Sequence, residues 1–202
     1  IGNQTHTGFD PGGSLAKWTT YYWRIDEKNP AGTTTGSLWR FTTAKLPLPN
    51  TTPGYIVGWK RPGFDDNYGV ISDIPDGNDY VLVTPSAFHS LALRSDGTIV
   101  EWGDSFYGPT EDNFVAMASG NPLNFAIRTD GTVVQWNGTG SEPDGNDFTA
   151  VSYGGKHNIF LREDGRLLGW GYDSLNQVSD TPTDCCYIDV GSGNYNSIAL
   201  KS

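Results

Sequence analysis

The chain has 202 residues and a formal net charge of −10, with 13 basic residues against 23 acidic ones. Binding to nucleic acid needs a surface rich in Lys and Arg, so this balance argues against a nucleic-acid partner. Glycine, proline and aromatic residues are abundant while methionine occurs once, a composition that favours strands and turns and predicts an all-β fold. No apolar run reaches the roughly 18 residues of a membrane-spanning helix, so we expect no membrane span.

The first 43 residues differ from the rest. Thr19-Thr-Tyr-Tyr-Trp-Arg-Ile-Asp26 alternates as a half-buried strand does, and Gly36-Ser-Leu-Trp-Arg-Phe-Thr-Thr43 is the expected returning strand, which predicts a hairpin. These two segments resemble the last two strands of a fibronectin type III-like domain from a secreted bacterial protein. The resemblance implies a partial β-sandwich in residues 1–43, because a complete one has roughly seven strands over about 100 residues.

Three strands of a sandwich do not close a core alone. We therefore expect that the opening strands were removed, that a neighbouring subunit covers the apolar face by strand addition, or that a small sheet packs on the repeats of residues 55–202. Residues 44–54 contain three prolines and show no periodicity. They are expected to form an extended linker.

Residues 55–202 repeat one motif. Asp-Gly pairs at Asp96, Asp130 and Asp164 lie 34 residues apart, each between two apolar segments of which the second ends in Trp. Such repetition is typical of solenoids and propellers, whose units bury their apolar faces only against neighbours. Asp-Gly between apolar strands predicts a hairpin with a type I′ turn. Short strands repeated in this way predict a propeller-like array of about four short blades.

One copy reads His89-Ser-Leu-Ala-Leu-Arg-Ser-Asp-Gly-Thr-Ile-Val-Glu-Trp-Gly103, and Trp170-Gly171 closes a second good copy. This motif resembles the regulator-of-chromosome-condensation repeat, whose core is H-S-L-A-L-x-x-D-G-x-V-x-x-W-G. The resemblance implies a propeller fold, although units in that family are usually longer and more numerous. It does not imply the founding member's nucleotide-exchange and chromatin activity, because a fold alone does not carry an activity.

One half of the repeated hairpin is left over at each end of the repeat region. Residues 55–59 supply only the strand after the turn, and residues 197–201 only the strand before it. The two halves would pair within one molecule in a closed four-blade ring, or between molecules in an open array or filament. Removal of further blades is a third alternative. The candidate assembly residues are Tyr55, Ile56, Val57, Trp59, Ile198 and Leu200.

A catalytic or ligand site should stand out as residues that break the repeat. His89 and His157 share one repeat column, so we interpret them as blade residues that bond a backbone carbonyl. The repeated tryptophans are interpreted as blade packing. No nucleophile elbow, phosphate-binding loop or calcium loop pattern occurs. We therefore expect no catalytic residue, no cofactor and no metal, and not an enzyme.

Two features bear on modification. Cys185 and Cys186 are adjacent, which does not suit a metal site and leaves three alternatives: free thiols, a vicinal disulfide, or bonds to another chain. The sequons at Asn3, Asn50 and Asn137 are candidate glycosylation acceptors in a secreted protein.

Together these features predict a non-catalytic extracellular or cell-surface protein with a structural or adhesive role, as a self-assembling subunit of a surface layer or fibre. Its expected partners are further copies of itself, by strand pairing. The alternative is a carbohydrate-binding accessory region of a larger secreted enzyme. Its glycan-contacting side chains would be the loop aromatics Phe64, Phe106, Tyr107 and Tyr172.

Overall fold

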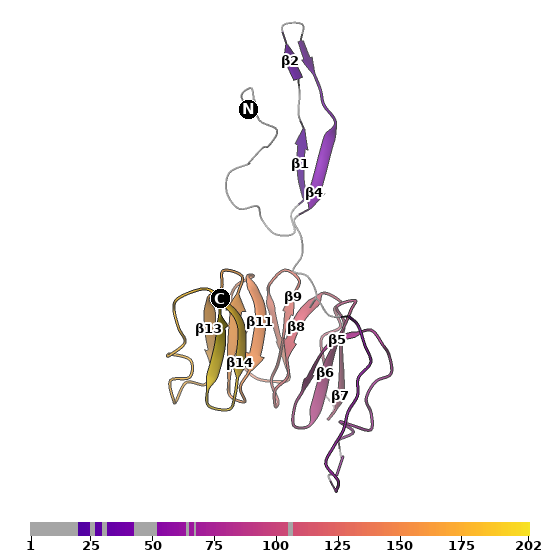
Figure 1. Ribbon diagram of the computed structural model, residues 1–202, viewed down its shortest axis with the longest axis vertical. Helices are drawn as coiled ribbons and strands as arrows, with labels where there is room; N and C mark the ends of the chain where they lie inside the picture. The colour runs from indigo at the N-terminus through magenta and orange to yellow at the C-terminus, as the bar shows by residue number, and fades with distance from the viewer. Residues whose placement is uncertain are drawn as a thin grey trace. The chain divides into compact units, whose positions relative to one another are not determined.

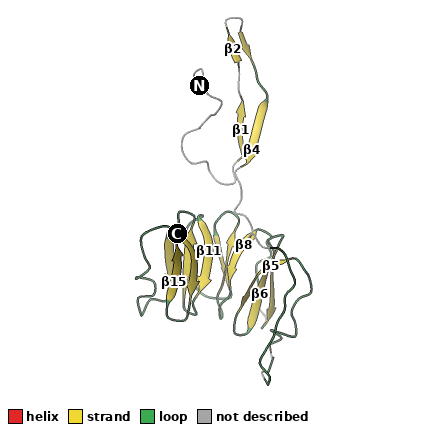
Figure 2. Ribbon diagram, viewed as in Figure 1, coloured by secondary structure: helices red, strands yellow, loops and turns green. Residues whose placement is uncertain are grey.

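The computed structural model describes residues 20–24, 27–29, 32–42, 52–63, 65–66, 68–104 and 107–202. The chain divides into two compact units, Ile1–Lys45 and Leu46–Ser202. Every regular element among the described residues is a β-strand, as the all-β prediction requires (Figure 2). None of these residues belongs to a helix of the length and apolarity that crossing a membrane demands.

The first unit contains a hairpin with a second, shorter strand pair nearer its turn. β1 (Thr20–Arg24) pairs antiparallel with β4 (Leu38–Thr42), and β2 (Glu27–Asn29) pairs antiparallel with β3 (Gly32–Thr34). The hairpin predicted between residues 19–26 and 36–43 is therefore present. Residues 1–19 lie outside the described part, so the partial sandwich stays a prediction.

Within its described residues, the second unit is a series of short antiparallel sheets, three with three strands and one with two. The strands are β5 (Tyr80–Pro85), β6 (His89–Arg94), β7 (Ile99–Gly103), β8 (Phe114–Ala118), β9 (Asn124–Arg128), β10 (Val133–Trp136), β11 (Phe148–Tyr153), β12 (His157–Arg162), β13 (Leu167–Gly171), β14 (Tyr187–Ser192) and β15 (Ser197–Lys201).

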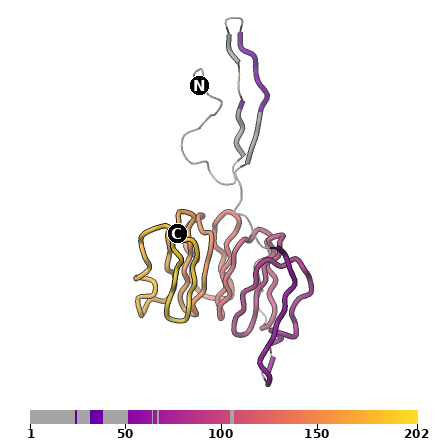
Figure 3. Tube along the Cα trace, viewed as in Figure 1, coloured from indigo at the N-terminus to yellow at the C-terminus, as the bar shows by residue number. Residues whose placement is uncertain are grey.

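These sheets stand side by side in chain order, like the blades of a propeller (Figure 1). Blade 1 is β5–β7, blade 2 is β8–β10, blade 3 is β11–β13 and blade 4 is β14–β15. Figure 3 follows the chain through them from purple to yellow. The prediction of an all-β array of about four short, blade-like units is therefore confirmed.

The Asp-Gly turns join the second and third strands of the three complete blades. Their glycines have positive φ angles: Gly97 90°, Gly131 80° and Gly165 76°. The aspartates do not, so the prediction of type I′ turns, which need positive φ at both positions, is wrong. Asp96 instead accepts bonds from Thr98 N at 2.9 Å and Thr98 Oγ1 at 2.7 Å, which hold its carboxylate against the turn. The Arg94 amide donates to Thr98 O, giving a three-residue loop in which glycine alone is left-handed.

The core lies between blades rather than within them. Alternate residues of a strand point to opposite faces, so each middle strand contributes to two interfaces. In β9, Ala126 joins the cluster shared with blade 1, whereas Phe125 and Ile127 pack with Phe148 and Phe160 of blade 3. Full burial of such side chains stabilises by roughly 1.5–3 kcal/mol each. Each blade therefore depends on its neighbours for most of its stability.

A cation–aromatic contact recurs at the start of every blade. The cation that ends the middle or last strand lies over the aromatic ring that begins the first one. The pairs are Arg94 over Tyr80 (5.2 Å), Arg128 over Phe114 (5.8 Å), Arg162 over Phe148 (4.5 Å) and Lys201 over Tyr187 (5.2 Å). Blade 4 keeps this contact although it has only two strands.

Candidate functional site

The segment Gly54–Trp59 occupies the place of a third strand that would belong to a blade before blade 1. In the complete blades, the turn glycine accepts the N–H of the aromatic residue that begins the next blade, as Gly97 O does from Phe114 N at 3.0 Å. Gly54 does the same with Tyr80, in a two-bond bridge of 3.1 and 2.9 Å. Gly54 thus stands in the column of turn glycines, and Tyr55–Trp59 in the column of β7, β10 and β13.

Beyond this bridge, residues 55–59 pair with no strand in the described part of the chain. The predicted half-strand is in position without being part of a sheet. At the other end of the array β15 pairs only with β14, in the register Val190 opposite Ala199. Since β15 and residues 55–59 do not meet, the described residues form an open array and not the closed four-blade ring.

Both incomplete blades carry exposed apolar side chains. Ile198 and Leu200 of β15 are 71% and 58% exposed, whereas Phe125 and Ile127, at the same positions of β9, are fully buried. In the segment at the other end, the exposed apolar residues are Tyr55 (75%), Val57 (63%) and Trp59 (83%). Ile56, the fourth of the predicted assembly residues there, is half-buried.

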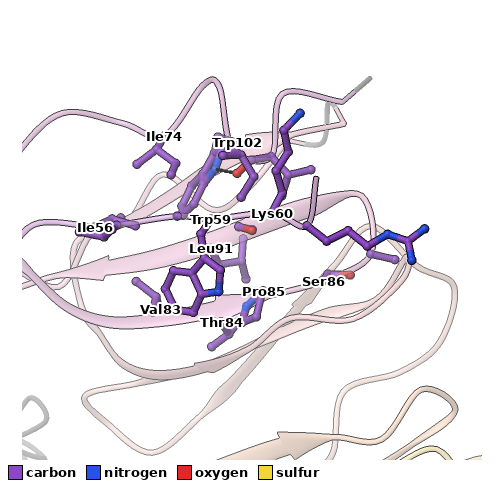
Figure 4. Close-up of a pocket in the computed structure, with 17 residues that line it drawn as sticks. Ile56, Trp59, Lys60, Ile74, Val83, Thr84, Pro85, Ser86, Leu91 and Trp102 are labelled. Carbon is purple, nitrogen blue, oxygen red and sulfur yellow. Dashed lines mark hydrogen bonds between the residues drawn. The ribbon is translucent and has the colours of Figure 1, made fainter. Parts of the chain in front are cut away.

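A mostly apolar groove of about 530 Å³ lies where this segment meets blade 1 (Figure 4). Its apolar lining includes Ile56, Trp59, Val83, Pro85, Leu91 and Trp102. Thr84 and Ser86 add hydroxyls, and Lys60 and Arg61 add cations. The Trp102 indole is fixed by a hydrogen bond from Nε1 to Val70 O at 2.9 Å, drawn as a dashed line.

Repeat symmetry shows what this groove corresponds to. Three of its residues share strand positions with blade 3: Val83 with Val151, Pro85 with Tyr153, and Trp102 with Trp170. In blade 3 those three residues pack on the cluster that contains Phe125 and Ile127. The groove therefore corresponds to the space between two blades. The middle strand of a preceding blade would fill it with two apolar side chains, as Phe125 and Ile127 of β9 do next to blade 3.

The two histidines of the repeat column link blade 1 to blade 2 and blade 3 to blade 4. His89 is fully buried, and its Nε2 lies 3.0 Å from Asn124 Oδ1 and 3.2 Å from Ser119 Oγ in blade 2. His157 is also buried, and its Nε2 lies 2.8 Å from Ser197 Oγ in blade 4. Burial lowers the pKa of His157. The Nε2 partners are side-chain oxygens, whereas a backbone carbonyl was expected.

Glu101 and Asn137 form a polar contact between blades 1 and 2. Glu101 accepts hydrogen bonds from Trp136 Nε1 at 3.3 Å and from Asn137 Nδ2 at 3.4 Å. Desolvation in this place raises the pKa of Glu101. The amide nitrogen that a glycan would modify on Asn137 is thus engaged. Asn3 and Asn50, the other two candidate acceptors, lie outside the described residues.

Two loop carboxylates, those of Asp66 and Asp173, accept hydrogen bonds from backbone amides. Although desolvation opposes the effect, hydrogen bonds from the Ser72 and Ile71 amides, at 2.7 and 3.1 Å, hold the pKa of Asp66 below its usual range. Asp173 accepts from Val178 N and Ser179 N in the same way. Within the described ranges no group of three or more His, Cys, Asp or Glu side chains is arranged to hold a metal ion.

Two of the four aromatics proposed for glycan contact are described. Tyr107 is 94% exposed, and Tyr172 is 47% exposed with Lys156 Nζ 5.1 Å from its ring centre. Phe64 and Phe106 lie outside the described residues. Cys185 and Cys186, directly before β14, carry free thiols.

Comparison with known proteins agrees with the propeller-like arrangement. The "Regulator of chromosome condensation (RCC1) repeat" family matches residues 148–177, which include all of blade 3. No curated protein matches the sequence. These matches give no support for a fibronectin type III-like part.

Several solved structures share the fold, among them the following three. The CRINKLY WD40 ectodomain of the Arabidopsis thaliana receptor kinase ACR4 is 21% identical, with a TM-score of 0.53 over 64% of this chain and 48% of that one. Human WBSCR16 is 16% identical, with a TM-score of 0.51 over 64% and 46%. Prp20p from Saccharomyces cerevisiae is 16% identical, with a TM-score of 0.50 over 81% and 51%.

The chain spans about half the length of each of these structures. Identities this low establish a shared fold and nothing about activity. The chain therefore contains an RCC1 repeat segment within an array of blades that is similar to RCC1- and WD40-type propellers.

Proposed function

We propose that this protein is a non-catalytic structural or adhesion protein of the cell exterior whose copies associate through their two incomplete blades. The observation that carries the proposal is their complementarity. Blade 4 has a first and a second strand, and Gly54–Trp59 lies in the third-strand column without the other two. Placed head to tail, β15 of one copy and residues 55–59 of the next make one three-stranded blade.

The side chains fit this joint. Ile198 and Leu200 of one copy enter the groove beside Val83 and Trp102 of the next, in the manner of Phe125 and Ile127 between blades 2 and 3. Burial of an exposed aliphatic side chain contributes about 1.5–3 kcal/mol. Association costs an estimated 4–15 kcal/mol, so a few such side chains and one strand ladder predict reversible, concentration-dependent assembly.

Sedimentation velocity over a wide concentration range tests the proposal. We expect the wild-type chain to form oligomers that lengthen with concentration, and Ile198→Lys to remain monomeric because a charge cannot enter the apolar groove. Tyr107→Lys, at a side chain that is 94% exposed and does not line the groove, is the matched control and should associate normally. A wild-type chain that stays monomeric throughout, or Ile198→Lys oligomers like those of the wild type, would contradict the proposal.

In this proposal, residues 1–43 are the last part of a fibronectin type III-like module to which the repeat unit is tethered. Its support is the β1–β4 hairpin, in which Trp23 stands opposite Trp39. Secretion and a surface location follow from that resemblance and belong to the proposal.

A second candidate function is carbohydrate binding, favoured by the exposure of Tyr107, whose ring could stack on a sugar. A glycan array measures it directly. Binding that Tyr107→Ala abolishes and Ile198→Lys leaves intact would favour this function over self-assembly, whereas an array without signal would remove it.

A further inference from the structure

The adjacent cysteines replace a pair of polar residues that the other blades carry at the same place. The residue directly before the first strand is Asp79, Asn113 or Asp147 in blades 1 to 3, and Cys186 in blade 4. The backbone at this position is part of the repeat, because Ser95 N donates to Asp79 O at 2.8 Å and Ser202 N donates to Cys186 O at 2.9 Å. The fold therefore fixes where the pair stands.

In blades 1 and 3 the residue directly before the first strand forms an ion pair, whereas the cysteines of blade 4 do not. Asp79 and Asp147 pair with the cation of their own blade, with nitrogen–oxygen distances of 3.4 Å to Arg94 and 2.5 Å to Arg162. In blade 4 the corresponding Lys201 pairs with Asp184 instead. Blade 2 has the same arrangement, since Arg128 pairs with Glu111, two residues before Asn113. The ion pair is thus retained without Cys185 or Cys186, and the two thiols take no part in it.

The two sulfur atoms are already together. Cys185 Sγ and Cys186 Sγ lie 2.6 Å apart, compared with about 2.05 Å in a disulfide bond. Cys186 has a φ of 78°, in the left-handed region that favours glycine. Backbone bonds on both sides keep it there, with Ser202 N donating to Cys186 O and Tyr187 N donating to Gly165 O. These bonds tie the backbone at Cys186 into the hydrogen-bonding pattern of the array.

The thiols are also accessible from solvent. Cys186 is exposed and Cys185 is half-buried. A reagent can therefore reach the sulfur of one cysteine while the sulfur of the other lies next to it. A second sulfur held in place makes ring closure an intramolecular step, which is favoured over attack by a second reagent molecule.

We propose that Cys185 and Cys186 are a modification site, which a low-molecular-weight disulfide such as glutathione disulfide converts into a vicinal disulfide. One cysteine thiolate attacks the reagent RSSR, forming a mixed disulfide and releasing RS⁻. The other thiolate attacks the protein sulfur of that mixed disulfide and releases the second RS⁻. The protein loses two protons and two electrons, and RSSR is reduced to two RSH.

Intact-mass spectrometry after incubation with glutathione disulfide tests this site. The reduced wild-type chain should lose the mass of two hydrogen atoms and keep no glutathione, and dithiothreitol should reverse the change. Cys185→Ser and Cys186→Ser should each stop at one glutathione adduct, because no second thiol is present to expel it. Accumulation of wild-type chains with two glutathione adducts, or of disulfide-linked dimers on a non-reducing gel, would overturn the proposal.

A trivalent arsenical supplies an independent probe of the paired thiols. Phenylarsine oxide bridges two neighbouring sulfurs, so one arsenical per chain should stay bound to the wild type after washing and none to either single variant. Retention that is equal in all three proteins would overturn the pairing. Both experiments are repeated on Ile198→Lys, so that failure of the thiol chemistry and failure of blade-to-blade association are read separately.

Discussion

At the scale of single residues, one repeat column holds the same side chain in opposite environments. Leu93 in β6 and Leu200 in β15 occupy equivalent positions, but Leu93 is fully buried while Leu200 is 58% exposed. The difference arises because blade 2 covers Leu93 and no described blade covers Leu200. The residue type alone therefore does not reveal which copy of the column is a contact surface.

This pair gives a matched test of stability. Leu93→Ala should lower the free energy of unfolding by about 2–5 kcal/mol, because it removes buried methyl groups and leaves a cavity. Leu200→Ala should change it by no more than about 0.5 kcal/mol in the monomer, as for other exposed sites. Urea unfolding at low protein concentration measures both. Equal losses in the two variants would show that Leu200 is covered within one molecule.

Glycines at the turns provide a second test at this scale. Gly131 and Gly63 have nearly the same φ, 80° and 79°. A Cβ on Gly131 would lie 2.3 Å from Asn146 O, whereas one on Gly63 would meet nothing within 4 Å. Both alanine variants carry the left-handed penalty of roughly 1–2 kcal/mol. Gly131→Ala should lose more than this in urea unfolding, since blade 3 must also move; the same loss in both variants would speak against the tight contact.

At the scale of elements, the Asp-Gly hairpins were predicted correctly from the sequence, whereas the predicted type I′ turn was wrong. Alternating apolar residues on both sides of Asp96 specify a hairpin, but the turn depends on hydrogen bonds from Thr98, which pattern alone does not reveal. The segment at residues 55–59 shows the opposite case. Its sequence is that of a strand, yet it forms no ladder because its partner strands are absent from the described residues.

The turn carboxylates predict how stability varies with pH. Bonds from Thr98 lower the pKa of Asp96, and bonds from Arg166 lower the pKa of Asp164. A carboxyl whose pKa is lower in the folded state stabilises the fold above its unfolded pKa, near the ordinary value of 3.8, and this contribution is lost as pH falls through the folded value.

The stability difference between wild type and the double variant Asp96→Ala/Asp164→Ala should therefore hold steady from pH 7 to about 5 and shrink below about 4. Urea midpoints across this range measure it. Taking the difference cancels Glu101, whose raised pKa has the opposite sign and favours the fold at low pH. A difference that stays constant down to about pH 3 would contradict the assigned hydrogen bonds.

At the scale of the whole molecule, the sequence identified the two leftover half-hairpins but could not decide where they meet. That choice depends on the faces that blade 1 and blade 4 present, which follow from packing and not from the repeat pattern. The groove was not predicted for the same reason. The sequence alone identifies Val83 and Pro85 as the equivalents of Val151 and Tyr153. Only the structure shows that Val151 and Tyr153 pack against the preceding blade, and therefore that Val83 and Pro85 lie on a contact face.

The most direct measurement mixes two variants that are each blocked at one end. Val83→Lys places a charge in the groove and leaves β15 intact, while Ile198→Lys blocks β15 and leaves the groove intact. Sedimentation velocity should find each variant monomeric alone and a one-to-one dimer in the mixture, capped at both ends and unable to grow. A mixture that remains monomeric, or either variant forming oligomers by itself, would contradict association through the incomplete blades.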